Sequence, residues 1–344
     1  MGFIESKLPD IWLLLIGFFL LYYAITDGAN LGIGILSLLP RDKRKMRAMM
    51  NSIGHTWHAS QTWLVILGGM LFGAFPLFYS VFLSALYIPV IIMLIGLIFR
   101  GVSFDFYERA RHKGFWLYAF GLGSLTVTLA QGFALGGLLG GLDIQDNHFA
   151  GSVWGWLTPY SALVAGGLFF GYLMLGANYL IARTTGPLQE QSYRLSWFTG
   201  LLTLALTSGV HLWTALHYPE TTARWLGAAG MYLALLLLAT AIAFIMFFRS
   251  LVKRQQVGPY FWNGAVIILS FTALSIGLYP NMIPGVKSPS MTVQAAAASP
   301  LTLKFMLLMT VILLPVIIAY TSYNYWIFRG KTDNPENGQN EYEL

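Results

Sequence analysis

The sequence of 344 residues contains no cysteine and few charged residues. Without cysteine the chain cannot hold a Cys-ligated iron–sulfur cluster, a CxxC zinc site, a c-type haem attachment or a disulfide. Charged residues make up 10% of the chain, against about 25% in an ordinary soluble domain. Hydrophobic residues make up 56%, and the mean hydropathy is +0.64. A soluble protein of this length does not bury so much apolar surface, so the composition indicates a membrane protein.

Long apolar runs are spread along the whole chain. Runs of about 20 residues match a helix that crosses the hydrocarbon core of a bilayer. The sequence therefore predicts an all-α polytopic membrane protein with nine transmembrane helices and no extramembrane domain. The predicted spans cover residues 9–38, 52–74, 78–99, 116–139, 157–182, 197–217, 227–248, 260–280 and 302–327.

The first apolar run is long and carries a polar interruption, ThrAspGlyAlaAsn at residues 26–30. This interruption predicts a kink or an unwound turn inside the first span. No small-residue cleavage site follows a short apolar core, so we expect the first span to remain as an anchor and not to be cleaved as a signal peptide.

The positive charges predict the orientation of the chain. Sixteen of the 20 Lys and Arg fall on the side of the C-terminus when nine spans are drawn. Because cytoplasmic loops carry the excess of Lys and Arg, this bias places the N-terminus outside and the C-terminus in the cytoplasm. We expect one transmembrane domain, 1–331, and a polar, disordered cytoplasmic tail, 332–344. The basic excess is then explained by topology and contact with anionic lipids, and not by nucleic acid.

Asp27 is the acidic residue that lies inside an apolar run, whereas the others fall in loops, tails or span ends. A carboxylate near mid-membrane costs about 2.5–3.5 kcal/mol on insertion scales, so it should face protein or water. We expect Asp27 to handle protons or ions, because intramembrane ionisable groups commonly do so. The alternative is a residue that caps a backbone break at Gly28.

Three histidines are candidates for chemistry. His55 and His58 are three residues apart and share one face of the second span. They are consistent with a proton relay, with binding of a small metal ion, or with interfacial histidines near the cytoplasmic headgroups. They cannot ligate one haem from opposite sides. His211, in the sixth span, is a candidate axial haem ligand, although a lone helical histidine is more often a packing residue. We therefore predict no metal site.

Arg100 and Asp105 flank the predicted cytoplasmic end of the third span. One interpretation is an ion pair between them that fixes a subunit contact. The other is that Arg100 extends to the headgroups while its stem stays in the apolar region. From these residues alone, a secondary transporter and a respiratory subunit are both consistent with the sequence.

Several motifs resemble those of one family. The segment 26–36, ThrAspGlyAlaAsnLeuGlyIleGlyIleLeu, is similar to the ThrAspGlyPheAspLeuGlyxGlyxLeu signature of cytochrome bd quinol oxidase subunit II. The segment 50–64 resembles a segment of the family in which a TrpAsp pair is followed by TrpLeu. The segments 71–79, 99–105 and 295–303 follow at the expected spacing. The resemblance covers nearly the whole chain.

The resemblance implies two four-helix bundles plus one peripheral helix. It implies a homologous partner, subunit I, which carries b-type and d-type haems and oxidises quinol, and it allows small single-helix accessory subunits. The complex would reduce O₂ to water and generate proton-motive force without pumping, in a bacterial or archaeal cytoplasmic membrane. Subunit II would support assembly, help to line proton and oxygen routes, and bind no haem itself, and it can bind a structural quinone.

The resemblance also assigns candidate residues. Asp27, Asn30, His58 and Gln61 are candidates for a proton path. Asn30 and His58 stand where the family has carboxylates, and His58 can still take up a proton near neutral pH. The candidates for an oxygen route or a subunit interface are Trp57, Trp63, Arg100 and Asp105. The alternatives are a proton-coupled secondary transporter and a paralogue that partners a different redox subunit.

Overall fold

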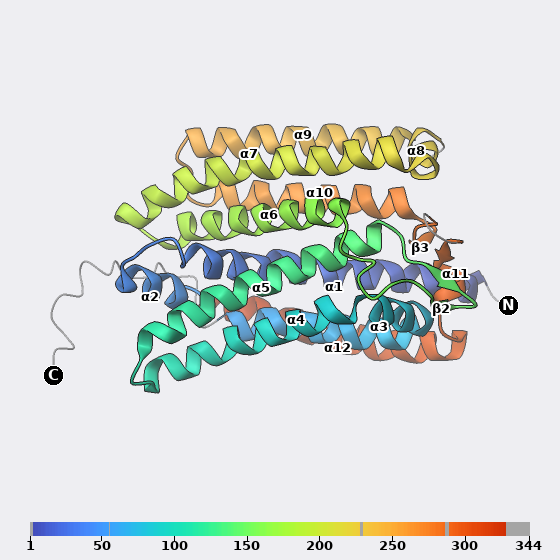
Figure 1. The fold of residues 1–344 in the computed structure, drawn as a ribbon, viewed down its shortest axis with the longest axis horizontal. Helices are drawn as coiled ribbons and strands as arrows, with labels where there is room; N and C mark the ends of the chain where they lie inside the picture. Colours follow the sequence, from blue (N-terminus) through green and yellow to red (C-terminus); the bar gives the residue numbers. More distant parts are fainter. Residues whose placement is uncertain (1–2, 55, 228–229, 286–288, 328–344) are drawn as a thin grey trace.

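The computed structural model describes residues 3–54, 56–227, 230–285 and 289–327, and most of them lie in helices (Figure 1). The first part of the chain forms α1 (Phe3–Leu36), α2 (Lys43–Asn51), α3 (Trp57–Ala74), α4 (Pro76–Arg109), α5 (Lys113–Leu139), β1 (Ile144–Gln145) and β2 (His148–Phe149). The second part forms α6 (Pro159–Arg183), α7 (Gly186–His217), α8 (Pro219–Leu226), α9 (Gly230–Val252), α10 (Gly258–Leu278), β3 (Asn281–Ile283), β4 (Met291–Thr292), α11 (Val293–Ala296) and α12 (Pro300–Ile327).

Eight helices in these described ranges are long and apolar enough to cross a membrane: α1, α4, α5, α6, α7, α9, α10 and α12. This result confirms the predicted all-α polytopic membrane protein. The helix α3 lies where the second span was predicted but has only 18 residues, and its first turns carry His58, Gln61 and Thr62. By its length and composition alone, α3 is therefore not identified as a membrane-spanning helix.

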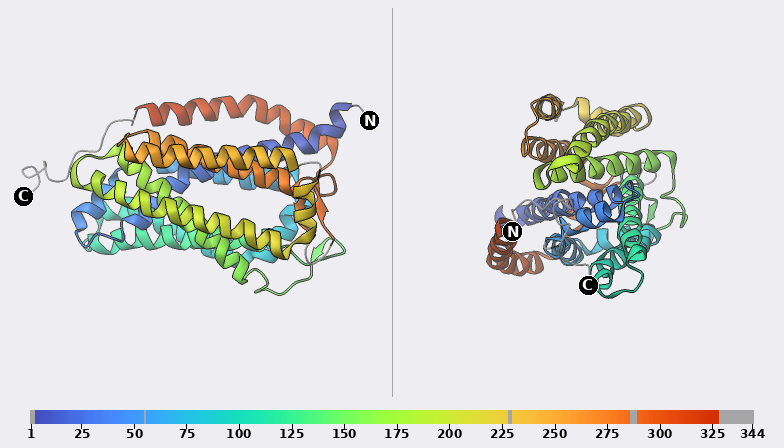
Figure 2. Two further views of the ribbon diagram at one scale, coloured as in Figure 1. Left: turned by 90° about the horizontal axis from the view of Figure 1, so that it is seen from above. Right: turned by 90° about the vertical axis from the view of Figure 1, so that its left-hand side faces the viewer.

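The long helices pack side by side in two groups (Figure 1). In one group α1 contacts α3 and α5, and α4 packs along α5; in the other α6 contacts α7, and α9 contacts α10. The two groups meet where α6 packs against α1 and α5. The helix α12 contacts α3 and α1 and lies at the outer edge of the molecule, in red in Figure 2.

The helix α1 runs without a break through the polar residues 26–30, so the predicted kink was wrong. The glycines there serve packing. A side chain at Gly32 would collide with the backbone carbonyl of Tyr172 on α6, and a Cβ at Gly28 would lie 2.6 Å from the Tyr172 ring. Because glycine leaves that space open, α1 and α6 approach closely while both helices keep their backbone hydrogen bonds.

A kink does occur in α4, where Leu86 has non-helical angles of φ −120° and ψ 20°. Pro89 lies three residues later. Its ring lacks an N–H and clashes with the carbonyl four residues earlier, which bends a helix at this position. The kink therefore follows from the sequence of α4 itself.

The two ends of the helix bundle differ. The end of the bundle at which α1 begins also carries α8, β2, β3 and α11 (Figure 1). There α11 packs against α1 and α4, and the indole of Trp12 donates to the carbonyl of Leu303 at 3.0 Å, which joins α1 to α12. The opposite end carries α2, a short helix whose Met46, Met49 and Met50 are buried against the bundle.

Candidate functional site

A buried ion pair between Asp27 on α1 and Arg100 on α4 lies inside the group of helices formed by α1, α3, α4 and α5. The two guanidinium nitrogens of Arg100 donate to the two carboxylate oxygens of Asp27, Nη1 to Oδ2 at 2.9 Å and Nη2 to Oδ1 at 2.6 Å. Both side chains are 0% exposed. This two-pronged geometry is the strongest form of a charge-assisted hydrogen bond, and it adds directional specificity.

Glycines on α4 and α5 bring Arg100 to this position. A Cβ at Gly123 on α5 would lie 3.0 Å from the backbone nitrogen of Arg100, and one at Gly96 on α4 would lie 2.9 Å from the Gly123 carbonyl. The two helices therefore pack backbone to backbone at the level of the ion pair. The Arg100 side chain has space to point inward, across the group, to α1.

This position corrects both interpretations that the sequence left open for Arg100. Asp105 is exposed on α4 and forms no ion pair with Arg100, whose carboxylate partner is Asp27. Arg100 also does not extend to the headgroups, because its side chain is fully buried. The unbroken α1 likewise excludes the capping role considered for Asp27.

A chain of polar side chains extends from the ion pair to α3 and α12. The amide nitrogen of Asn30 donates to Asp27 Oδ1 at 3.4 Å and to the Ser60 hydroxyl at 3.1 Å. Ser60 also lies 3.0 Å from the hydroxyl of Tyr325 on α12. Asn30 and Ser60 are buried. One continuous set of hydrogen bonds therefore joins α4, α1, α3 and the outer helix α12.

A second polar group lies nearby between α1, α5 and α6. The amide nitrogen of Gln131 donates to the hydroxyl of Tyr23 at 2.6 Å, and the hydroxyl of Tyr172 donates to the amide oxygen of Gln131 at 3.1 Å. Ser60, Tyr325 and this group were not among the predicted site residues. A glutamine inside an apolar run was the sequence signal that could have indicated Gln131.

The remaining candidates on α3 point in different directions. Trp57 is buried, with its ring stacked on Phe104 at a centroid distance of 4.9 Å. His58 is exposed, and its ring stacks directly on that of Trp57 at a centroid distance of 3.5 Å. Gln61 is half-buried, and its amide nitrogen has no hydrogen-bond partner among the described residues. Among the described residues, the hydrogen-bond partners of Asp27 are Asn30 and Arg100, and neither His58 nor Gln61 is one of them.

Trp63 lies deeper in α3 than these residues and is fully buried. Its ring packs against Tyr22 at a centroid distance of 4.1 Å and against Phe18 and Phe19. This aromatic cluster joins α3 to α1. It contains no charged side chain.

Of the three histidine candidates, the structure describes His58 and His211, which lie on different helices, α3 and α7. His55 lies outside the described residues. His211 is half-buried on α7, with Nδ1 2.7 Å from the carbonyl of Thr207 and its ring 6.1 Å from that of Trp225. Across the described ranges, no group of three or more His, Cys, Asp or Glu side chains comes together.

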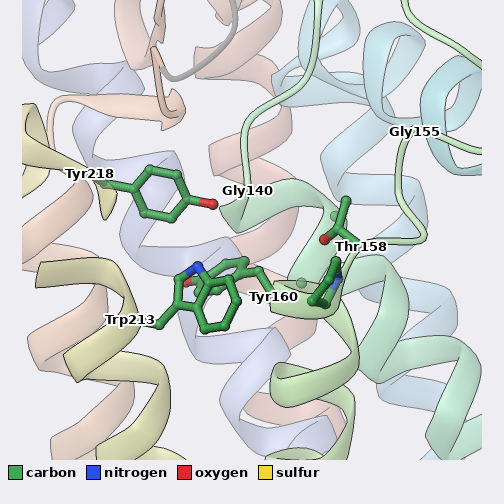
Figure 3. Close-up of a pocket in the computed structure, with 9 residues that line it drawn as sticks. Gly140, Gly155, Thr158, Tyr160, Trp213 and Tyr218 are labelled. Atoms are coloured by element: carbon green, nitrogen blue, oxygen red, sulfur yellow. The ribbon is translucent and has the colours of Figure 1, made fainter. Parts of the chain in front are cut away.

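A hollow of about 290 Å³ opens at the end of the bundle where α5 ends and α6 begins (Figure 3). Its aromatic lining comes from Tyr160, Trp213 and Tyr218, and its floor includes Gly136 and Gly140. Burial, followed by the effect of Tyr160, raises the pKa of Tyr218, so its hydroxyl stays protonated. A second hollow of about 170 Å³ lies between Ala85, Asp143 and Trp156.

Neither hollow has a histidine or methionine in its lining. The donor set of a haem is therefore not present in either of them, and we derive no step through a haem held by the described residues of this chain. The first hollow has the neutral, aromatic and hydroxyl-bearing character of a site for an uncharged ring.

The ion pair limits what Asp27 can do chemically. Both carboxylate oxygens accept hydrogen bonds from Arg100, so the charge of Asp27 balances that of the guanidinium. Removing this carboxylate charge would leave a guanidinium in a low-dielectric interior, which is costly because the remaining charge has no counter-ion. The geometry therefore favours a fixed electrostatic centre, with hydroxyl and amide groups of several helices nearby.

These features define a class: a polytopic helical membrane protein whose spans are joined by a buried ion pair and its polar neighbours. Within that class, the chain belongs to the family described as cytochrome bd terminal oxidase subunit II, whose sequence pattern matches residues 8–328. This confirms the family that the motifs indicated.

Individual relatives agree over nearly their full length. The chain is 30% identical over 384 residues to cytochrome bd-I ubiquinol oxidase subunit 2 of Escherichia coli (strain K12), with 97% of each chain covered. It is 27% identical over 341 residues to cytochrome bd ubiquinol oxidase subunit 2 of Bacillus subtilis (strain 168), which covers 96% of this chain and 98% of the relative. A chain in the structure of bd oxidase from Geobacillus thermodenitrificans has the same fold, with a TM-score of 0.79, 19% identity, and coverage of 94% and 98%.

Proposed function

We propose that this chain is the second subunit of a quinol:O₂ oxidoreductase of the cytochrome bd type. Its family membership over residues 8–328 carries the proposal. In the assembled complex a homologous subunit I would hold the b-type and d-type haems and oxidise quinol. Electrons would reduce O₂ to water, and the uptake of protons from the cytoplasm would generate proton-motive force without a pump.

We propose nine transmembrane helices in two four-helix bundles, with α12 as the peripheral helix. The contacts of α1, α3, α4 and α5 and those of α6, α7, α9 and α10 support this grouping. The polar start of α3 would then lie beside protein or water in the membrane. The basic end of the molecule, which includes Arg47 and Lys113, would face the cytoplasm, with the N-terminus outside. The membrane would be the cytoplasmic membrane of a bacterium or archaeon.

The main role that we assign to Asp27 and Arg100 is positional. The pair fixes α1 against α4, and Asn30 extends this connection to Ser60 on α3 and Tyr325 on α12. The outer surface of α3 and α12 is thereby held rigid. Such a surface suits an obligate contact with a partner subunit, because little conformational entropy is lost when the two subunits associate.

A proton route in this subunit would begin at His58. It is exposed at the basic end of α3, and an imidazole exchanges protons near neutral pH. Gln61 lies one turn further along the same helix face, with an unpartnered amide nitrogen. Asn30 would act by hydrogen bonding and Asp27 by its fixed charge, because the Asp27 carboxylate is paired with Arg100.

The tryptophans and Asp105 have different proposed roles. Trp63, in its uncharged aromatic cluster, would line a route for O₂, which is apolar and enters dry protein readily. Trp57 would position His58, since the two rings stack. Asp105 is exposed and would face the partner subunit or a small accessory helix.

A structural quinone would fit the hollow lined by Tyr160, Trp213 and Tyr218 (Figure 3). The protonated Tyr218 hydroxyl would donate to a ring carbonyl, and Trp213 would pack on the ring face. Replacing Tyr218 by Phe should then lower the amount of quinone extracted from the purified complex without changing its haem content.

The direct test is purification of the tagged chain in mild detergent, followed by a reduced-minus-oxidised spectrum. A larger partner in equal amount, with b-type and d-type haem bands, is the expected result. Bands of b-type alone would instead indicate a paralogue with a different redox partner. A haem-free chain that purifies alone and monodisperse would contradict the proposal and favour the transporter.

A further inference from the structure

Several cations converge on one aromatic ring at the end of the molecule that carries α2. The guanidinium of Arg47 lies over the ring of Tyr107, with Cζ 5.6 Å from its centre, and the ammonium of Lys113 lies 5.9 Å from the same centre. The Lys43 ammonium is adjacent, since a Cβ at Gly114 would lie 2.9 Å from its Nζ. We call Arg47, Lys113, Lys43 and Tyr107 the Tyr107 site.

The cations of the Tyr107 site have no carboxylate partner. Among the described residues, no Asp or Glu lies within ion-pairing distance of Arg47, Lys113 or Lys43. Asp42, next to Lys43 in the sequence, is used as a cap, because its carboxylate accepts from the backbone nitrogen of Arg44. Glu108, next to Tyr107, is exposed and forms no ion pair with these cations. Like charges therefore gather here at a net electrostatic cost.

The same end of the molecule contains a matched arrangement that is neutralised. Arg254 lies over the ring of Tyr193 at 5.1 Å, much as Arg47 lies over Tyr107. There the guanidinium also donates to the carboxylate of Glu190, and Arg194 lies 3.9 Å from the same carboxylate. The Tyr107 site has the aromatic platform and the cations but lacks the anion.

Exposed aromatic side chains indicate the depth of the Tyr107 site in the membrane. Phe106 and Phe115 are 51% and 59% exposed, and both contact Trp116, with the rings of Phe106 and Trp116 stacked at 4.9 Å. Aromatic residues of this kind gather at the boundary between headgroups and hydrocarbon. Cations directly beside them lie at the level of lipid phosphates. In addition, α5 begins here without a side-chain cap, so its first backbone N–H groups face the same region.

We propose that the Tyr107 site binds the phosphate of an anionic phospholipid, whose negative charge takes the place that Glu190 fills in the matched arrangement. Arg47 and Lys113 bind the phosphate from α2 and from the start of α5, and Lys43 adds a third contact. The acyl chains lie along Phe106 and Phe115. The lipid thereby joins α2 to the α4–α5 hairpin. This inference is independent of the redox role of the chain.

The test measures lipid retention on the whole purified complex by native mass spectrometry, with added phosphatidylglycerol or, for comparison, phosphatidylcholine. The double variant R47Q/K113Q should weaken the apparent affinity of one phosphatidylglycerol site by about 30-fold, as expected for the loss of two cations near lipid phosphate. Phosphatidylcholine binding should not change. The variant R47K/K113R, which keeps both charges, should retain the lipid.

The matched control is R249Q/K253Q, which removes two exposed cations from the same end of the molecule, at the end of α9. It should retain phosphatidylglycerol like the unmodified complex. Equal loss in both double variants would overturn the proposal, because the effect would then reflect overall charge. Unchanged retention in R47Q/K113Q would also overturn it. Displacement of the lipid by inorganic phosphate at equal phosphate concentration would show a free-anion site and would contradict the lipid as its occupant.

Discussion

The molecule contains two Arg–carboxylate pairs with the same two-pronged geometry in very different surroundings. Arg100 and Asp27 are 0% exposed, whereas Arg254 is 60% and Glu190 43% exposed at the end of the helices. The buried pair is connected to Asn30, whereas water reaches the exposed one. The comparison shows that the environment, and not the hydrogen-bond pattern, decides what an ion pair contributes.

The two pairs differ in the free-energy cost of removing one partner. If one partner of the buried pair is removed, the other is an unpaired charge in a medium of low dielectric constant. If one partner of the exposed pair is removed, water and salt solvate the other. The buried pair therefore fixes which helices pack together, and the exposed pair adjusts the surface.

The largest predicted effect is that of Asp27→Asn. It leaves the Arg100 guanidinium buried without a counter-ion, so we expect a loss of about 3–5 kcal/mol in stability. The thermal transition of the purified complex, followed by size-exclusion chromatography, measures it. We expect a lower yield of assembled complex. Normal assembly with slower turnover would instead favour a direct proton role for Asp27.

A smaller loss is predicted for Gly32→Ala, which tests the close contact between α1 and α6. The added methyl meets the backbone of Tyr172, and overpacking of this kind costs about 1–3 kcal/mol. Gly264→Ala is the matched control, because a Cβ there meets no atom within 4 Å. Equal thermal transitions for the two variants would refute the packing role of Gly32.

Tyr325→Phe removes the hydroxyl at the end of the polar chain and keeps the ring. The Ser60 hydroxyl then loses one partner but keeps Asn30, so we expect a loss of about 1 kcal/mol. Tyr320→Phe, at a position 61% exposed on the same helix, is the control and should be silent. A larger loss from the control would show that α12 is held by other contacts.

The smallest effect is predicted for Glu190→Gln. The pair with Arg254 is exposed, so its removal should leave the thermal transition of the complex unchanged at physiological salt. The same measurement as for Asp27→Asn gives the direct comparison between the two pairs. A shift as large as that of Asp27→Asn would contradict the role assigned to burial.

The sequence predicted the fold class and the position of the helices well, because apolar runs follow the thickness of the membrane. It identified Asp27 but missed its partner. Arg100 is 73 residues away on another helix, and no local spacing connects the two. The rule that long basic side chains extend to the headgroups gave the wrong expectation at a helix whose glycines admit an inward-pointing arginine.

The kink predicted in α1 failed for a related reason. Gly28 and the polar residues around it look like a chain break when only α1 is considered, and only the neighbour Tyr172 shows that the space is needed for packing. The roles of His58, Gln61, Trp57 and Trp63 stay predictions. Ser60 and Tyr325 could not be predicted because an isolated hydroxyl in a span gives no signal of its partner.

A double-mutant cycle shows whether Asp27 and Arg100 act as one unit. The stability of the assembled complex would be measured for Asp27→Asn, Arg100→Gln and the double variant. We predict that the double variant is more stable than the sum of the single losses implies, by about 2 kcal/mol or more, because it leaves no unpaired charge. Additive losses would contradict this prediction.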